Sequence, residues 1–181
     1  MTEAFETLEG VMQHAVALAG RGVGRVEPNP AVGAVLVDER LRILGEGWHG
    51  VFGGTHAEVE ALEAAGESAR GATLVVTLEP CSHHGQTPPC TDAVLASGVD
   101  RVVVGIGDPS PHADGGGLSI LREAGVVVEL GVGAEAVERL NAPFLHLVGT
   151  GRPWIHAKWA MTLDGRIAAT GGHSQWISSE D

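Results

Sequence analysis

Both cysteines of the chain lie in one short stretch, "TLEPCSHHGQTPPC", which runs from Thr77 to Cys90. Cys81 and Cys90 are separated by eight residues that include two adjacent histidines. Such a pair can form a disulfide, bind a metal ion, or consist of two buried thiols. The upstream stretch "THAEVEAL" adds His56 and Glu58. One imidazole and two thiolates are three ligands of a tetrahedral zinc ion, which leaves a fourth position for water, as a catalytic site requires.

Glu58 is the candidate proton carrier of such a site. Zinc lowers the pKa of a bound water toward about 7 and makes hydroxide available as a nucleophile. Glu58 is only two residues from His56, so we expect it not to be a ligand but to move protons between that water and the leaving group. An acid in the first turn of a helix is also commonly stabilised by the helix dipole alone. A structural zinc with His83 or His84 as fourth ligand is the alternative to a catalytic one.

The surrounding pattern predicts the elements that would position these side chains. Apolar residues at helical spacing from Phe5 to Ala19, behind a possible Thr2 cap, predict a first helix, and two β-type runs joined by "DER" predict a hairpin. Helices and strands then alternate, which predicts a largely parallel sheet covered on both faces. The predicted elements are strands at 31–37, 41–47, 72–78, 101–107 and 126–130 and helices at 56–65, from 90, 118–124 and 134–148.

This alternation predicts that the three ligand candidates converge. His56 lies at the start of a predicted helix, Cys81 at the end of a strand and Cys90 at the start of the next helix. The carboxyl ends of parallel strands and the amino ends of the following helices meet at one sheet edge, where ligands bind in α/β folds. The helix amino termini would also favour the thiolate forms of both cysteines.

The charge and composition of the chain restrict its partners. The formal net charge is −12, the isoelectric point is about 5.1, and Lys158 is the one lysine. This balance is unsuited to a nucleic-acid partner and favours a small-molecule substrate. The absence of an 18-residue apolar run and the acidic start "MTEAFETLEG" predict a cytoplasmic protein without a membrane segment. In that compartment cysteines are reduced, buried or metal-bound more often than disulfide-linked.

The His-x-Glu and Pro-Cys elements match the signature of zinc nucleobase deaminases, except that the signature has two residues between the cysteines and this chain has eight. With this longer loop, "EPCSHHGQTPPC" resembles the deaminase domain of the bifunctional riboflavin-biosynthesis family RibD. Three further segments extend the resemblance over about residues 5–150: "EPNPAVGAVLV", "GWHGVFGGTHAEVEAL" and "VVVGIGDPSPHADGGG". The resemblance implies a three-layer α/β/α sandwich with a mixed sheet, cytidine-deaminase-like, in which the first hairpin is antiparallel and the later strands are parallel.

The resemblance also implies an activity and roles for individual residues. The activity is hydrolytic removal of the 2-amino group from 2,5-diamino-6-ribosylamino-4(3H)-pyrimidinone 5′-phosphate, with Zn²⁺ bound by His56, Cys81 and Cys90 and with Glu58 as proton shuttle. It favours a homo-oligomer. Residues matched to substrate contacts are Asn29, His49, His83, Gln86 and Asp108. From the residues alone, Asn29, His49 and Asp108 can equally be structural residues of turns and loops.

Gln86 is where the chain departs from the family, which usually has Lys or Arg before "TPPC". Replacing a cation by a neutral amide removes a charge-assisted hydrogen bond to phosphate worth about 1.5–3 kcal/mol. Arg21, Arg25 or His84 could compensate, or the substrate could lack the phosphate.

The segment "RPWIHAKWAMTLDGRIAATGGHSQWIS" resembles the opening of the reductase domain that follows the deaminase in this family. We therefore expect a deaminase domain at 1–150 and a truncated start of a reductase domain at 151–181, in which "WIHAKWA" reads as a strand. The glycine motifs form no complete dinucleotide fingerprint, so we expect no NADPH binding.

Two rival functions follow from the same residues. One is a zinc deaminase of another base, nucleoside or dephosphorylated pyrimidine, which turnover assays on these substrates would distinguish. The other is a non-catalytic zinc-stabilised module that supports a partner reductase. An intact biological activity after Glu58→Gln would favour this module.

Overall fold

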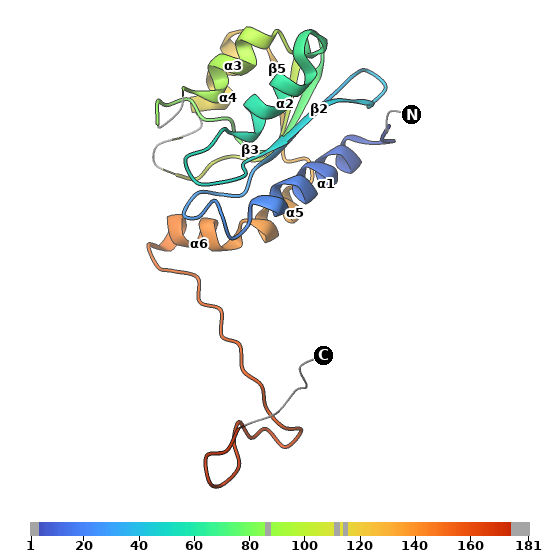
Figure 1. The fold of residues 1–181 in the computed structure, drawn as a ribbon. Coiled ribbons are helices and arrows are strands. Elements are labelled where there is room, and N and C mark those ends of the chain that lie inside the picture. The colour runs from blue at the N-terminus through green and yellow to red at the C-terminus, as the bar shows by residue number, and fades with distance from the viewer. Residues whose placement is uncertain (1–3, 86–87, 111–112, 114–115, 175–181) are drawn as a thin grey trace.

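A computed structural model of the chain describes residues 4–85, 88–110, 113 and 116–174. Five strands form one mixed sheet in the order β2-β1-β3-β4-β5 (Figure 1). β1 runs antiparallel to both of its neighbours, whereas β3, β4 and β5 are parallel to one another. This confirms the predicted mixed sheet with an antiparallel first hairpin. The strands are β1 (Gly33–Val37), β2 (Ile43–Trp48), β3 (Thr73–Leu78), β4 (Arg101–Ile106) and β5 (Val127–Leu130).

Helices cover both faces of the sheet, which confirms the predicted α/β/α layers. On one face α1 and α5 pack on β1, β3 and β4 around Met12, Val75 and Val103. On the other face α2, α3 and α4 enclose a second core around Leu36, Leu74 and Val102. The helices are α1 (Leu8–Ala19), α2 (Ala57–Ala65), α3 (Cys90–Ser97), α4 (Gly116–Glu123), α5 (Ala134–Leu140) and α6 (Ala142–Thr150), with 3₁₀ turns at Gly20–Gly22 and Gly66–Ala69.

Two helices of the structure differ from the prediction, one in where it begins and one in being divided. The first helix begins at Leu8, and its N-cap is Thr7, whose Oγ1 accepts a hydrogen bond from the N–H of Gly10 at 3.1 Å. The proposed cap Thr2 lies outside the described residues. The single helix predicted at 134–148 is two helices that meet at Asn141. Pro143 in the first turn of α6 has no N–H to continue the hydrogen bonding of α5, so the break falls just before it.

Glycines in β1 and β2 allow the helices to approach the sheet closely. A Cβ atom on Gly33 would lie 2.1 Å from the carbonyl oxygen of Ala15 in α1. A Cβ atom on Gly47 would lie 2.6 Å from the carbonyl oxygen of Ala57, in the first turn of α2. Contacts this short are not tolerated, so these two glycines set how closely α1 and the start of α2 lie to the sheet.

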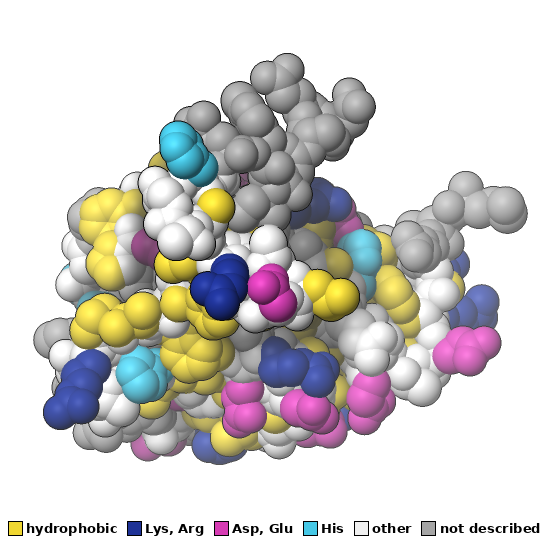
Figure 2. All heavy atoms as spheres, turned by 90° about the horizontal axis from the view of Figure 1, so that it is seen from below, with side chains coloured by type: hydrophobic (Ala, Val, Ile, Leu, Met, Phe, Trp, Pro, Cys, Tyr) yellow, Lys and Arg dark blue, Asp and Glu magenta, His cyan; other side chains and the backbone are white. Residues whose placement is uncertain are grey.

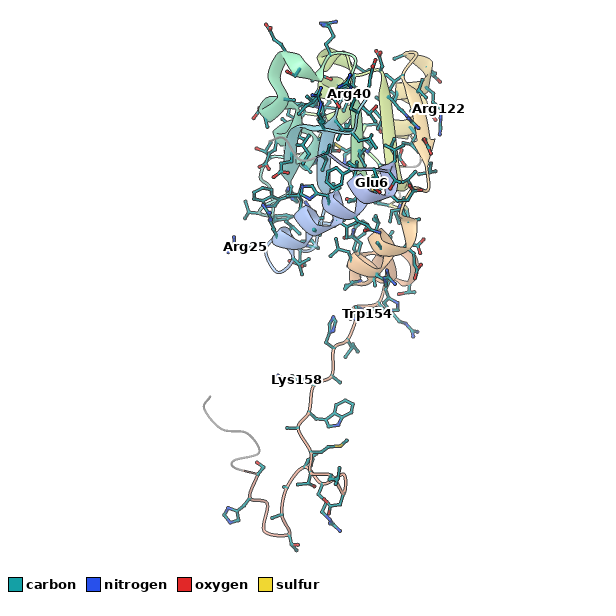
Figure 3. The ribbon with its side chains drawn as sticks, turned by 90° about the vertical axis from the view of Figure 1, so that its right-hand side faces the viewer. Glu6, Arg25, Arg40, Arg122, Trp154 and Lys158 are labelled. Carbon is teal, nitrogen blue, oxygen red and sulfur yellow. The ribbon has the colours of Figure 1, made fainter. Side chains whose placement is uncertain are left out.

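The segment after α6 leaves the sandwich as an extended chain (Figure 1). Figure 3 shows Trp154 and Lys158 on this segment, outside the sandwich. The prediction of a strand in "WIHAKWA" is wrong, because residues 154–160 have no strand pairing and a strand requires a partner. Figure 2 shows hydrophobic side chains, interspersed with charged ones, on the face from which the segment emerges. Large exposed hydrophobic residues of the segment are Trp154, Ile155, Trp159, Met161, Leu163 and Ile167.

No helix among the described residues combines the length and the apolar character that a membrane crossing needs.

Candidate active site

The structure brings the three predicted metal ligands together. His56 is the N-cap of α2, Cys81 follows β3, and Cys90 is the first residue of α3. The Nδ1 atom of His56 lies 3.0 Å from the Sγ atom of Cys90 and 3.6 Å from that of Cys81. All three donor atoms lie within 4.8 Å of one another. A nitrogen and a sulfur ligand of one tetrahedral zinc lie about 3.6 Å apart, so this donor set fits a zinc ion.

The protonation of the cluster in the metal-free protein also favours metal binding. The pKa of the Cys81 thiol is lowered, chiefly because the Cys90 thiol donates a hydrogen bond to its sulfur, and the backbone N–H of Cys90 donates another at 3.2 Å. The pKa of Cys90 is raised because it supplies the proton that the two sulfurs share. The hydrogen bond with Cys81 raises the pKa of His56. These shifts favour the thiolate form of Cys81 at the amino end of α3, where the helix dipole also stabilises a negative charge.

Glu58 lies in the first turn of α2, two residues after His56, and its side chain is almost fully buried. Burial raises the pKa of its carboxyl group to about 7, against smaller opposite effects of its own backbone N–H and of His56. A carboxyl group with a pKa near neutrality can both accept and return a proton, as a general acid and base must.

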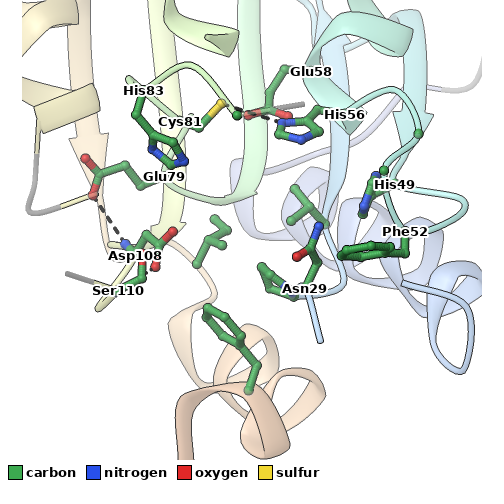
Figure 4. A pocket seen from close by; sticks show the side chains of 17 residues that line it. Asn29, His49, Phe52, His56, Glu58, Glu79, Cys81, His83, Asp108 and Ser110 are labelled. Atoms are coloured by element: carbon green, nitrogen blue, oxygen red, sulfur yellow. Dashed lines mark hydrogen bonds between the residues drawn. The ribbon is translucent and has the colours of Figure 1, made fainter. Parts of the chain in front are cut away.

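A cavity of about 430 Å³ opens beside the cluster at the carboxyl end of β3 and β4 (Figure 4). It is lined by the ligand candidates His56 and Cys81 and by Glu58. Four of the residues predicted to hold the substrate also line it: Asn29, His49, His83 and Asp108. Gln86, the fifth, lies outside the described residues. The predicted residues from four separate loops therefore face one cavity.

His49 presents an acceptor inside this cavity. Its Nδ1 atom lies 3.0 Å from the backbone carbonyl oxygen of Thr55, so Nδ1 must carry the proton that forms this hydrogen bond. In the neutral ring Nε2 is then unprotonated. That Nε2 atom is buried and has no hydrogen-bond partner among the described residues. Because a buried nitrogen without a partner is unfavourable, a ligand N–H is the natural group to satisfy it.

Sequence reasoning missed Glu79, which is buried at the end of β3. Its Oε2 accepts a hydrogen bond from the N–H of Asp108 at 3.3 Å, and its Oε1 accepts one from the N–H of Leu118 at 3.2 Å. Figure 4 shows the first of these bonds and the neighbouring Ser110, which also lines the cavity. The signal in the sequence was the "EPC" motif, in which Glu79 directly precedes Pro80 and Cys81.

The cavity has no lysine or arginine among its described lining residues. Of the arginines considered as phosphate contacts, Arg21 places its guanidinium 4.9 Å from the ring centre of Trp48, and neither it nor Arg25 lines the cavity. His84 is exposed and does not line the cavity either. Among the described lining residues, no side chain thus carries a permanent positive charge that could bind a phosphate group.

Comparison with known proteins agrees with this geometry. Residues 5–106 match the sequence profile of the cytidine and deoxycytidylate deaminase zinc-binding region. This match covers more than half of the chain and includes all three ligand candidates. Residues 153–181 match the profile of the RibD C-terminal domain.

Related proteins carry the name riboflavin biosynthesis protein RibD. The relative from Aquifex aeolicus is 51% identical over 94% of this chain and 48% of its own length, and that from Escherichia coli is 51% identical over 94% and 46%. The crystal structure of a diaminohydroxyphosphoribosylaminopyrimidine deaminase/5-amino-6-(5-phosphoribosylamino)uracil reductase from Thermotoga maritima superimposes with a TM-score of 0.90 at 48% identity, covering 96% of this chain and 50% of that one. The chain spans about half the length of these relatives. It therefore belongs to the family defined by the cytidine and deoxycytidylate deaminase zinc-binding region, as a homologue of the RibD deaminases.

Proposed function

We propose that the chain is a zinc-dependent deaminase that hydrolyses 2,5-diamino-6-ribosylamino-4(3H)-pyrimidinone 5′-phosphate in riboflavin biosynthesis. The observation that supports it most is the packing of His56, Cys81 and Cys90 beside the buried Glu58 at one end of the cavity. The solved relative from Thermotoga maritima is described as a deaminase of this kind.

In this proposal His56, Cys81 and Cys90 hold the zinc ion. The bound metal supplies an activated water beside the reacting carbon. Glu58 takes a proton from that water and gives it to the ring nitrogen. It then takes the proton of the newly formed hydroxyl group and gives it to the amino group, which leaves as ammonia while the carbonyl group forms. A carbon–oxygen bond forms, the carbon–nitrogen bond breaks, and no oxidant or reductant is required.

The remaining lining residues orient the pyrimidine ring. Nε2 of His49 accepts a hydrogen bond from a ring or exocyclic N–H, because it is a buried acceptor that has no partner among the residues that the structure describes. Asn29 lines the same cavity and lies on the same side as His49 and Phe52 in Figure 4, where its amide offers both a donor and an acceptor to the base. His83 and Asp108 lie toward the ribosyl end of the ligand in this proposal.

We further propose that residues 1–150 are the deaminase domain and that 151–181 begin a reductase domain. The match of 153–181 to the RibD C-terminal domain supports this division. So does the change at Gly151, after which the side chains are almost all exposed.

The test is ammonia release by the zinc-loaded chain, offered the pyrimidinone ribosylamine with and without its 5′-phosphate. Turnover only of the phosphorylated compound is the expected result. Turnover of the dephosphorylated compound would favour the alternative substrate, which is suggested by Gln86 and by the lack of a lysine or arginine among the described lining residues. Glu58→Gln, which keeps the shape of the side chain but cannot shuttle a proton, is the control for background hydrolysis. Failure of both compounds would contradict the proposed function.

A further inference from the structure

The junction between α5 and α6 is tied to the loop that carries Asn29. Asn141 lies at this junction and is buried, with 3% of the residue exposed. Its Oδ1 accepts a hydrogen bond from the N–H of Ala31 at 2.8 Å, and its Nδ2 donates one to the carbonyl oxygen of the same residue at 3.0 Å. The side-chain amide thus pairs with the backbone of Ala31 as a neighbouring strand would. Ala31 is two residues from Asn29, so this pair fixes the path of the loop at the cavity.

Apolar packing supports the same attachment. Leu140, the last residue of α5, packs against a small core of Ala19, Val26 and Ala31. This core lies apart from the two large ones on the faces of the sheet. The start of α6 is therefore held to the loop before β1 by both hydrogen bonds and packing.

One turn beyond Asn141, α6 contributes Phe144 to the cavity lining. Phe144 is the only described lining residue that follows β5, because all the others lie between Asn29 and Ser110. Figure 4 shows the α6 ribbon across the cavity from His56 and Glu58. None of the side chains of α6 is buried. Phe144 is thus not a core residue, and part of its ring is open to whatever occupies the cavity.

We propose that Phe144 is a specificity-determining residue that contacts the substrate, and that Asn141 is the positioning residue that holds α6, and with it Phe144, against the loop of Asn29. This rests on the proposed deaminase function. An aromatic ring on the wall of a cavity that takes a heteroaromatic base offers a stacking or edge contact to the substrate. It also excludes water from that side of the reacting ring.

The test compares Phe144→Ala and Phe144→Tyr with Leu147→Ala, a truncation of an exposed residue on the same helix that does not line the cavity. We expect Phe144→Ala to raise KM about tenfold, because the loss of one aromatic–base contact weakens binding by about this factor, and to change kcat little. Phe144→Tyr should restore most of the affinity, and Leu147→Ala should leave both constants unchanged. Zinc content should be the same in all variants, since none of them touches a ligand candidate.

Asn141→Asp keeps the acceptor for the N–H of Ala31 but loses the donor to its carbonyl oxygen. We expect it to raise KM as Phe144→Ala does and to speed hydrogen exchange at the amide of Ala31. A double substitution with Phe144→Ala should add little to either single one, because both act through the same contact.

Substrate binding can be measured by calorimetry in proteins that carry Glu58→Gln. This measurement tests the Phe144 contact independently of turnover, and so independently of the proposed function. Weaker binding in Glu58→Gln/Phe144→Ala than in Glu58→Gln supports the contact even if the parent turns out to be slow. Equal binding in the two proteins overturns the contact, whatever the turnover. If the parent neither binds nor converts the substrate, both the proposed function and the contact that rests on it are overturned.

Discussion

The carboxylate of Glu79 accepts a hydrogen bond from the backbone N–H of Asp108, so the end of β3 holds the loop that follows β4. The second oxygen of the same carboxylate accepts a hydrogen bond from the N–H of Leu118 in α4. Three segments at the carboxyl edge of the sheet are thereby connected through one buried side chain. The strand that leads to Cys81 is thus connected directly to the loop that places Asp108 at the cavity.

Glu79→Gln is expected to disturb this connection. An amide offers only one acceptor oxygen, so one of the two N–H groups loses its partner, at a cost of about 1–3 kcal/mol in the free energy of unfolding. We expect kcat/KM to fall about 10- to 100-fold, because a small displacement of the loop misplaces the substrate. Urea denaturation and steady-state kinetics measure the two effects. Glu67→Gln, at an exposed acid, is the control. Equal kinetics for the two variants would contradict the positioning role of Glu79.

Zinc content tests the ligand assignment. Cys90→Ser and His56→Ala should each reduce bound zinc, measured by elemental analysis after dialysis, from about one ion per chain to a small fraction. His83→Ala and His84→Ala should retain the metal, since three protein ligands and a water complete a catalytic site. Loss of zinc in either of these two variants would instead indicate a structural site with four protein ligands.

The pKa of Glu58 predicts a pH dependence of stability in the metal-free protein. The folded-state pKa of about 7 lies above the ordinary value of 4.5. The neutral form therefore stabilises the fold fully below pH 4.5, and this contribution is lost as the pH rises through 7. A rise of this size in the pKa corresponds to about 3 kcal/mol in the free energy of unfolding. Glu58→Gln lacks this titration, so its free energy of unfolding should exceed that of the parent more at pH 8 than at pH 5. Parallel pH curves in urea denaturation would contradict the burial of a neutral carboxyl.

Gly47→Ala tests the close approach of α2 to the sheet. The added Cβ would lie 2.6 Å from the carbonyl oxygen of Ala57, so α2 has to shift together with the neighbouring His56. We expect a loss of about 1–3 kcal/mol in the free energy of unfolding and weaker zinc binding, measured by denaturation and chelator competition. Gly20→Ala is the matched control, because its Cβ would meet no atom within 4 Å. Equal zinc affinity in the two variants would show that the metal cluster does not depend on this packing.

The sequence predicted the elements whose signals are local and missed features that depend on distant partners. Helical spacing and strand alternation predicted a largely parallel sheet with an initial hairpin and helices on both faces. The donor types of His56, Cys81 and Cys90, and their places at a strand end and at helix starts, predicted that these side chains meet. The break at Asn141 has a local signal in Pro143, but the pairing of the Asn141 side chain with Ala31, 110 residues away, leaves no local pattern. The "EPC" motif marks the position of Glu79, but its role was missed because its partners are backbone N–H groups, which the residue types do not reveal. "WIHAKWA" alternates as a strand does, but alternation does not provide a partner.

The separation between Asn141 and Ala31 also has a consequence for the order of folding. His56 and Cys90 are 34 residues apart, whereas the amide pair that holds α6 in place joins residues 110 apart. Closing the longer loop costs more conformational entropy and requires the intervening strands to be in place. During synthesis the three ligand candidates His56, Cys81 and Cys90 therefore emerge before α6 does. We expect a nascent chain to capture zinc before it has a cavity wall against which a substrate could bind.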